Sequence, residues 1–221
     1  METTSTAKPT AIIPPHVEDI LNNEGVIVCV GTGRSGKTAL GHLLASQSTK
    51  PVKLIAYPTS AIQACPQGWE SVSLNEVFTL RDCVLIFDDA ALFASSRNFG
   101  TDFQKAWIQF QTIISHKGIT IIFIIQSMNL LDIGTLRSQR MVVLYKFSDL
   151  INVKYERDEF KKFAITSRNH IQTCRNKFPH IHPKSFVFDC HSYSVWSHPL
   201  PEHWQPILST PYRDYIVEVK P

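Results

Sequence analysis

Eight residues near the start of the chain, GTGRSGKT at 31–38, have the types and spacing that suit phosphate binding. Gly31 and Gly36 permit backbone angles that a side chain would forbid, so successive N–H groups can point at phosphate oxygens. Lys37 would reach the β- and γ-phosphates of a nucleotide, and the Thr38 hydroxyl would bind Mg²⁺. We therefore expect a segment that binds ATP through Gly31, Thr32, Gly33, Arg34, Ser35, Gly36, Lys37 and Thr38.

An acidic pair follows another apolar run, in VLIFDD at 84–89, about 50 residues after the phosphate-binding segment. We expect Asp88 to hold Mg²⁺, directly or through water, and Asp89 to accept a proton from an attacking water molecule. A helix N-cap would account for one of these two carboxylates but not for both. The pair therefore favours hydrolysis of a nucleotide over a purely structural role.

Further polar residues would complete a site for phosphoryl transfer. Gln126 follows the run GITIIFII, and its neutral amide would hydrogen-bond the γ-phosphate or the attacking water. Charge that develops in the transition state also needs a cation, and one arginine would act as a finger supplied to a neighbouring subunit. The candidates, each of which is also explained as a solvated surface residue, are Arg97, Arg137 and Arg140.

The elements that must position these residues are apolar runs separated by helical segments. The runs are continuously apolar rather than alternating, which is typical of parallel strands covered on both faces. They lie at 25–30, 52–57, 83–89, 118–125 and 140–147, with helices expected at 37–48, 73–80 and 101–117. This order predicts an α/β fold with a doubly wound, mainly parallel sheet and helices on both faces. Its strand ends would carry the phosphate segment, the acidic pair and Gln126.

The chain divides into three parts by pattern: an arm at 1–24, a core at 25–150 and a small C-terminal elaboration at 151–221. In the elaboration we expect a helix at 158–178, a strand pair within 184–197 and another strand within 211–221. Six Lys or Arg residues and no acidic residue occur from Lys161 to Lys184. That stretch would present a cationic face to nucleic-acid phosphates, or else an ordinary solvated helix face, with equal weight. The aromatic stripe in 101–117 is expected to pack in the core rather than to stack on bases.

Composition narrows the class of protein. The chain has 221 residues, of which 43% are hydrophobic, so it can build one substantial core. The net charge of +3 does not by itself require a nucleic-acid partner. The five cysteines are odd in number and form no C-x-x-C, which favours a reducing compartment without a disulfide framework or a zinc site. The longest apolar runs are too short to span a bilayer, and no signal-peptide core occurs, so we expect no transmembrane segment.

The order of these motifs resembles the FtsK–HerA superfamily of P-loop motor ATPases, in which the two sites are called Walker A and Walker B. Within it, the chain is similar to viral genome-packaging ATPases of the poxvirus type and of internal-membrane icosahedral viruses. The resemblance covers roughly 25–147 and includes the acidic pair, the basic turn HKG at 116–118 and the strand ending in Gln126. Two features depart from the usual pattern: Asp89 where the family has Glu, and His116 and Lys117 where many members have an arginine.

The resemblance implies a RecA-like P-loop fold and an ATPase that uses Mg²⁺ to pump double-stranded DNA into a capsid. It also implies a homo-oligomeric ring, a pentamer or hexamer, with ATP between subunits. Further implied partners are capsid, portal or membrane-vertex proteins, and the implied location is the virion or the host cytoplasm. The alternatives are a filamentous-phage or conjugation-type assembly ATPase, a P-loop nucleoside or nucleotide kinase, and an assembly switch that hydrolyses ATP slowly.

Overall fold

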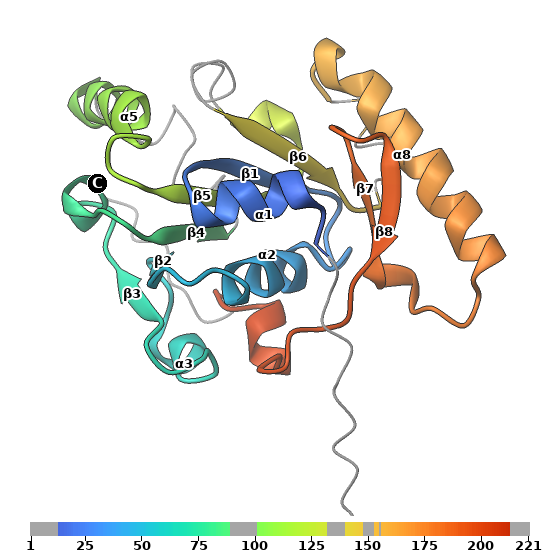
Figure 1. Cartoon of the computed structure of the whole chain (residues 1–221), viewed down its shortest axis with the longest axis horizontal. Coiled ribbons are helices and arrows are strands. Elements are labelled where there is room, and N and C mark those ends of the chain that lie inside the picture. Colours follow the sequence, from blue (N-terminus) through green and yellow to red (C-terminus); the bar gives the residue numbers. More distant parts are fainter. Residues whose placement is uncertain (1–12, 89–100, 132–139, 148–152, 155, 213–221) are drawn as a thin grey trace, which may run out of the picture.

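The computed structural model describes residues 13–88, 101–131, 140–147, 153–154 and 156–212, without the side chains of 101–104 and 108 (Figure 1). Three of the predicted site residues, Asp89, Arg97 and Arg137, lie outside these ranges. Nearly all of the strand expected at 211–221 lies outside them as well, and it stays a prediction.

Within the described residues, eight strands form one sheet in the order β3-β2-β4-β5-β1-β6-β7-β8. The strands from β3 to β6 in that order run parallel to one another, whereas β7 and β8 are antiparallel to their neighbours. This confirms the mainly parallel sheet predicted from the continuous apolar runs. The strands are β1 Gly25–Val30, β2 Val52–Ile55, β3 Glu70–Val72, β4 Val84–Asp88, β5 Thr120–Ile125, β6 Met141–Tyr145, β7 Phe186–Asp189 and β8 Ser194–Ser197.

Helices cover both faces of the sheet (Figure 1). The residues of β1 alternate between two buried clusters, because successive side chains of a strand point to opposite faces. One cluster contains residues of α1 (Pro15–Asn22), α2 (Lys37–Ser46) and the 3₁₀ helix η4 (Pro206–Ser209). The other contains residues of α5 (Thr101–Ile113) and α8 (Asp158–Lys177). The predicted α/β class is therefore confirmed.

The aromatic stripe of the segment 101–117 packs as expected. Trp107, Phe110 and Ile114 are buried in the same cluster as the strands, and the Trp107 ring meets Phe87 of β4 at 5.3 Å between centroids. Ile113 is the exception, with 41% of its surface exposed. Core packing is thus confirmed for the Trp107 and Phe110 rings, whereas the Phe103 side chain lies outside the described residues.

Two local expectations differ from the structure. The segment 73–80 forms only a short 3₁₀ helix, η1 (Glu76–Thr79), in which Val77 alone is buried. The carboxylate of Glu76 accepts the backbone N–H of Ser73 at 2.7 Å, and this bond closes a single turn in place of a longer helix. The sequence also missed β3 and the short helix α3 (Thr59–Ile62), which carry no run of apolar residues.

The C-terminal elements continue the sheet. β7 and β8 form the expected antiparallel pair, β7 adds to the edge of β6, and α8 packs on β7. Figure 1 shows α8 in orange beside these strands, at the end of the sheet away from β3. None of the described helices is both long and apolar enough to cross a membrane.

Candidate nucleotide-binding site

The loop that follows β1 needs its glycines for two different reasons. A Cβ atom on Gly31 would lie 2.8 Å from Ser35 Oγ and 2.9 Å from Lys146 Cβ, so the close approach of neighbouring atoms excludes a side chain. Gly36 has φ of 92°, in the left-handed region, and is the residue immediately before α2. A Cβ on Gly33 would meet nothing within 4 Å, which leaves that part of the loop open for a ligand.

The interior of the loop presents hydrogen-bond donors. Lys37 is the first residue of α2, is only 7% exposed, and donates from Nζ to the carbonyl oxygen of Thr32 at 3.0 Å. Ser35 Oγ is buried and has no hydrogen-bond partner among the described residues. A buried hydroxyl without a partner is costly, and phosphate oxygens would supply the acceptor it lacks. Together with the N–H groups that begin a helix, these donors fit a bound phosphate chain.

The two predicted metal ligands come together across the sheet. Asp88 is the last residue of β4, and β5 separates β4 from the β1 strand that carries the loop. Thr38 Oγ1 nevertheless lies 3.3 Å from Asp88 Oδ1, and Asp88 is only 3% exposed. A hydroxyl and a carboxylate are hard oxygen ligands of the kind that Mg²⁺ prefers, so the residues present fit this ion. Their role as metal ligands stays a prediction.

The other predicted residues lie at opposite ends of the parallel strands. Gln126 is exposed and directly follows Ile125 of β5, whose carbonyl oxygen accepts the N–H of Gly31 at 3.2 Å. The backbone of Gln126 therefore lies beside the loop, between the ends of β1 and β4. Arg140 instead directly precedes β6, at the opposite end of the strands, where it forms an ion pair with Asp19 of α1.

The basic turn before β5 also lies at this opposite end of the strands. Lys117 Nζ donates to the carbonyl oxygens of Phe78 and Leu80 at 2.9 and 3.2 Å. These bonds bind the lysine to its own subunit and close the end of the sheet around η1. Lys117 of the basic turn thus has structural partners here.

Sequence reasoning missed Tyr57 and His42, which lie beside Asp88. The Tyr57 hydroxyl donates to Asp88 Oδ2 at 3.1 Å, and His42 Nε2 lies 3.1 Å from the Tyr57 oxygen. Burial, followed by the nearby Asp88 charge, raises the pKa of Tyr57 well above its ordinary value. Burial, with a smaller contribution from His203, lowers the pKa of His42 to about 3, so the imidazole is neutral. The available signal was a tyrosine at the end of the apolar run 52–57.

Sequence reasoning also missed Lys146, a fully buried lysine behind the loop. Its Nζ donates to the carbonyl oxygen of Lys184 and lies 2.9 Å from His198 Nε2, while its backbone N–H donates to Val30 at 2.7 Å. Burial lowers the pKa of Lys146 to about 7, and the charge of Arg175 acts in the same direction. The side chain thereby joins the end of β6 to the C-terminal elaboration directly behind Gly31.

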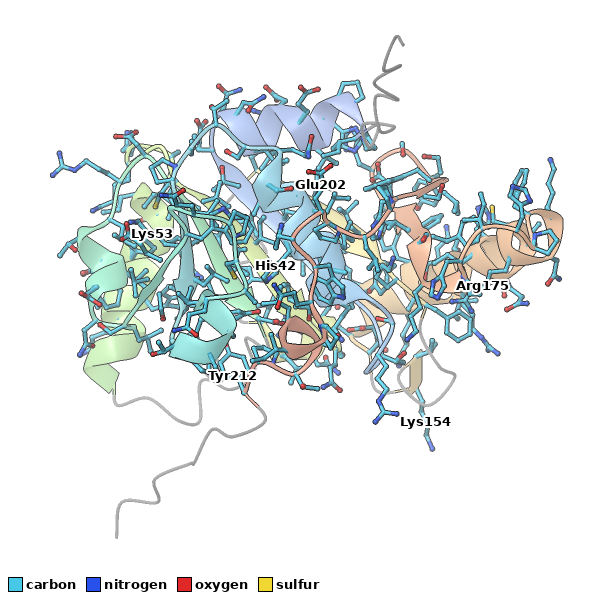
Figure 2. All side chains as sticks on the ribbon, turned by 90° about the horizontal axis from the view of Figure 1, so that it is seen from below. His42, Lys53, Lys154, Arg175, Glu202 and Tyr212 are labelled. Carbon is cyan, nitrogen blue, oxygen red and sulfur yellow. The ribbon has the colours of Figure 1, made fainter. Side chains whose placement is uncertain are left out.

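A second contact joins the elaboration to the loop. The guanidinium of Arg175, on α8, lies over the ring of Phe147 at 4.4 Å and donates to the carbonyl oxygen of Pro183 at 3.0 and 3.2 Å. Phe147 in turn accepts both the backbone N–H of Thr32, at 3.3 Å, and its hydroxyl, at 3.2 Å. Figure 2 labels Arg175 and the buried His42, which lie in separate parts of the molecule.

Comparison with known proteins bears on the fold. No protein-family model matches the sequence, and no curated protein matches it. The crystal structure of B204, the DNA-packaging ATPase of Sulfolobus turreted icosahedral virus, matches with a TM-score of 0.53 at 13% identity, over 82% of this chain and 100% of that one. This chain shares the fold of a viral DNA-packaging ATPase. The resemblance predicted from the motifs is thus confirmed at the level of the fold.

Two further structures are more distant by TM-score. The genome-packaging NTPase B204 of Sulfolobus turreted icosahedral virus 2, in complex with sulfate, has a TM-score of 0.49 at 14% identity, over 81% of this chain and 98% of that one. RuvB of Thermotoga maritima has a TM-score of 0.41 at 12% identity, over 63% of this chain and 45% of that one. The shared fold is inferred from the first B204 structure alone.

Proposed function

We propose that this chain is an ATPase that hydrolyses Mg²⁺-bound ATP to move double-stranded DNA, as a viral genome-packaging motor does. One observation carries the ATPase proposal: Thr38 Oγ1 and Asp88 Oδ1 lie 3.3 Å apart, directly beside the buried Lys37 at the start of α2. A hydroxyl, a carboxylate and an ammonium group at one helix N-terminus are what a metal-bound triphosphate requires.

Each residue then has a distinct task. Bound Mg²⁺ would neutralise charge on the β- and γ-phosphates, and Thr38 and Asp88 would hold it. Lys37 would exchange its bond to the Thr32 carbonyl oxygen for bonds to phosphate oxygens. Asp89 would take a proton from the attacking water, and Gln126 would orient that water.

The arginine finger would come from a neighbouring subunit of a pentameric or hexameric ring. Arg140 precedes β6, and β6 pairs in parallel with β1 over Val26–Val30. The length of these strands therefore separates Arg140 from the loop of its own subunit. Five residues of strand span about 16 Å. Arg140 would therefore act only on the loop of another subunit. Arg97 and Arg137 are the other candidates for this role.

The exposed lysines of the C-terminal elaboration support a nucleic-acid partner. Lys162 and Lys177 of α8 are exposed, as is Lys184 just beyond it, and phosphate backbones attract such cations. The same helix reaches the nucleotide loop through Arg175 and Phe147. A DNA strand on this face would thus act on an element in contact with the site of hydrolysis. Capsid, portal or membrane-vertex partners, and a place in the virion or host cytoplasm, are parts of the same proposal.

The test is ATP hydrolysis measured with and without double-stranded DNA. We expect DNA to accelerate hydrolysis, and Lys37→Ala to abolish it while the protein stays folded by circular dichroism. Lys53→Ala is the matched control, because Lys53 lies on β2 and pairs with Glu70 of β3, away from the loop. Hydrolysis that ignores DNA would favour an assembly switch, and phosphate transfer to an added nucleoside would favour a kinase. Full hydrolysis by Lys37→Ala would contradict the ATPase proposal.

A further inference from the structure

Asp88 belongs to a line of hydrogen bonds that leads from the candidate metal site to the C-terminal elaboration. Its two carboxylate oxygens have different partners: Oδ1 faces the Thr38 hydroxyl, and Oδ2 accepts from the Tyr57 hydroxyl. Beyond Tyr57 lies His42, and His42 Nδ1 is 3.2 Å from Nε2 of His203. Four residues from four separate parts of the chain thus form one continuous line.

The chemistry of the groups fixes the direction of every bond in this line. The single proton of the Tyr57 hydroxyl goes to Asp88, so the Tyr57 oxygen must accept from His42 Nε2–H. A neutral imidazole with its proton on Nε2 has an acceptor at Nδ1, and His203 Nε2–H donates to it. All three donors therefore point toward the carboxylate.

Packing holds the rings of this line in place. Tyr57 is 4% exposed and His42 is fully buried. The His42 ring contacts Trp69 and Trp204 at centroid distances of 5.3 and 5.8 Å, and Tyr212 meets Tyr57 edge-on at 5.6 Å. Figure 2 shows His42 in the interior of the molecule, and Tyr212 near the end of the described chain. Rings confined in this way cannot turn to other partners.

We propose that Tyr57 and His42 are positioning residues that fix the orientation of Asp88, and that His203 extends this support to the C-terminal segment. The inference rests on the proposed function, because it gives Asp88 the task of holding Mg²⁺. A carboxylate with one oxygen held by a buried donor presents the other oxygen in a constant direction, here toward Thr38. Outer partners of this kind typically change metal affinity by about 10- to 100-fold.

The test measures metal-dependent nucleotide binding without turnover. Fluorescent ADP is bound to the protein while Mg²⁺ is varied, and binding is measured again in EDTA. Tyr57→Phe removes the hydroxyl alone, and we expect it to raise the Mg²⁺ concentration for half-maximal binding by about tenfold or more. Binding in EDTA should not change, because it depends on the loop and not on Asp88. The matched control is Tyr212→Phe, which removes a hydroxyl that donates to Ile55 at 3.2 Å and should leave the Mg²⁺ requirement unchanged.

A second pair of variants tests the next bond. His42→Leu leaves the Tyr57 oxygen without its donor, whereas His42→Gln retains an N–H group. We expect His42→Leu to raise the Mg²⁺ requirement by several fold and His42→Gln to restore part of the loss. This pair also decides the question if Tyr57→Phe does not fold.

Two results would overturn the inference, and they differ. If Tyr57→Phe and Tyr212→Phe, or His42→Leu and the wild type, need the same Mg²⁺ concentration, the positioning role is wrong while the ATPase proposal stands. If the wild type binds nucleotide with no dependence on Mg²⁺, both the positioning role and the proposed function are wrong.

Discussion

The buried Lys146 makes a prediction about how stability depends on pH. In the folded protein its pKa is about 7, well below the ordinary lysine value of 10.5, because burial penalises the charged form. The unfolded chain therefore binds more protons than the folded one between pH 7 and 10.5. The contribution of Lys146 to the free energy of unfolding must rise with pH across that window, and it is least favourable below pH 7.

The magnitude follows from the two pKa values. Integrating the difference in bound protons from pH 7.0 to 8.5 gives a gain of about 1.6 kcal/mol in the free energy of unfolding. Other buried groups act in the opposite direction at higher pH. Burial raises the pKa of Cys29 to about 12, so its thiol ionises first in the unfolded chain and lowers stability above about pH 9. The window below pH 8.5 keeps that contribution small.

The assay is urea unfolding of the wild type and of Lys146→Met at several pH values from 7.0 to 8.5. Met fills a similar volume without a charge, so the variant should lose the rise of about 1.6 kcal/mol whatever its absolute stability. Lys162→Met, at an exposed position of α8, controls for the loss of one positive charge and should keep the rise. Parallel curves for the wild type and Lys146→Met would refute the argument, because they would mean that Lys146 binds its proton equally in both states.

Three further predictions concern the candidate site. Gly31→Ala should weaken nucleotide binding by about tenfold or more, because its Cβ would overlap Ser35 and Lys146; binding equal to that of the wild type by calorimetry would contradict this. Asp88→Asn should weaken Mg²⁺-dependent nucleotide binding, and Asp89→Asn should keep binding but lose turnover; equal loss of binding would argue against separate roles. ATPase activity per subunit should rise with protein concentration, since a finger in trans contributes roughly 10³–10⁵ in rate. Lys37→Ala protein should regain part of its activity when it is mixed with Arg97→Ala, Arg137→Ala or Arg140→Ala protein. If no mixture regains activity, and activity per subunit does not change with protein concentration, a shared site is excluded.

The sequence predicted well those features that one short segment determines. Continuous apolar runs placed β1, β4, β5 and β6 to within a few residues, because a buried parallel strand has to be apolar on both faces. The glycines of the nucleotide loop were equally plain, since Gly36 has a left-handed backbone and Gly31 has no room for a side chain. By contrast, β3 has only three residues, Glu70–Val72, and joins the sheet through pairing with β2 rather than through its own composition.

The sequence could not predict features that depend on distant segments meeting. Tyr57 reads as part of an apolar strand, and His42 reads as one residue of a helix that begins at the nucleotide loop. Their partnership with Asp88 exists only because β2 pairs with β4 and α2 packs on β4, which brings the three side chains to one point.

The C-terminal elaboration contacts residues on both sides of the nucleotide loop, again because distant segments meet in the fold. Lys146 reaches back to Lys184 and His198 behind Gly31, while His203 reaches His42 on the side of Asp88. In sequence these residues look like an appended region with scattered histidines. In the fold they contact two separate supports of the candidate site. A change in the position of this elaboration would therefore alter the loop and the proposed metal ligand Asp88 together, and the proposed motor function requires a coupling of this kind.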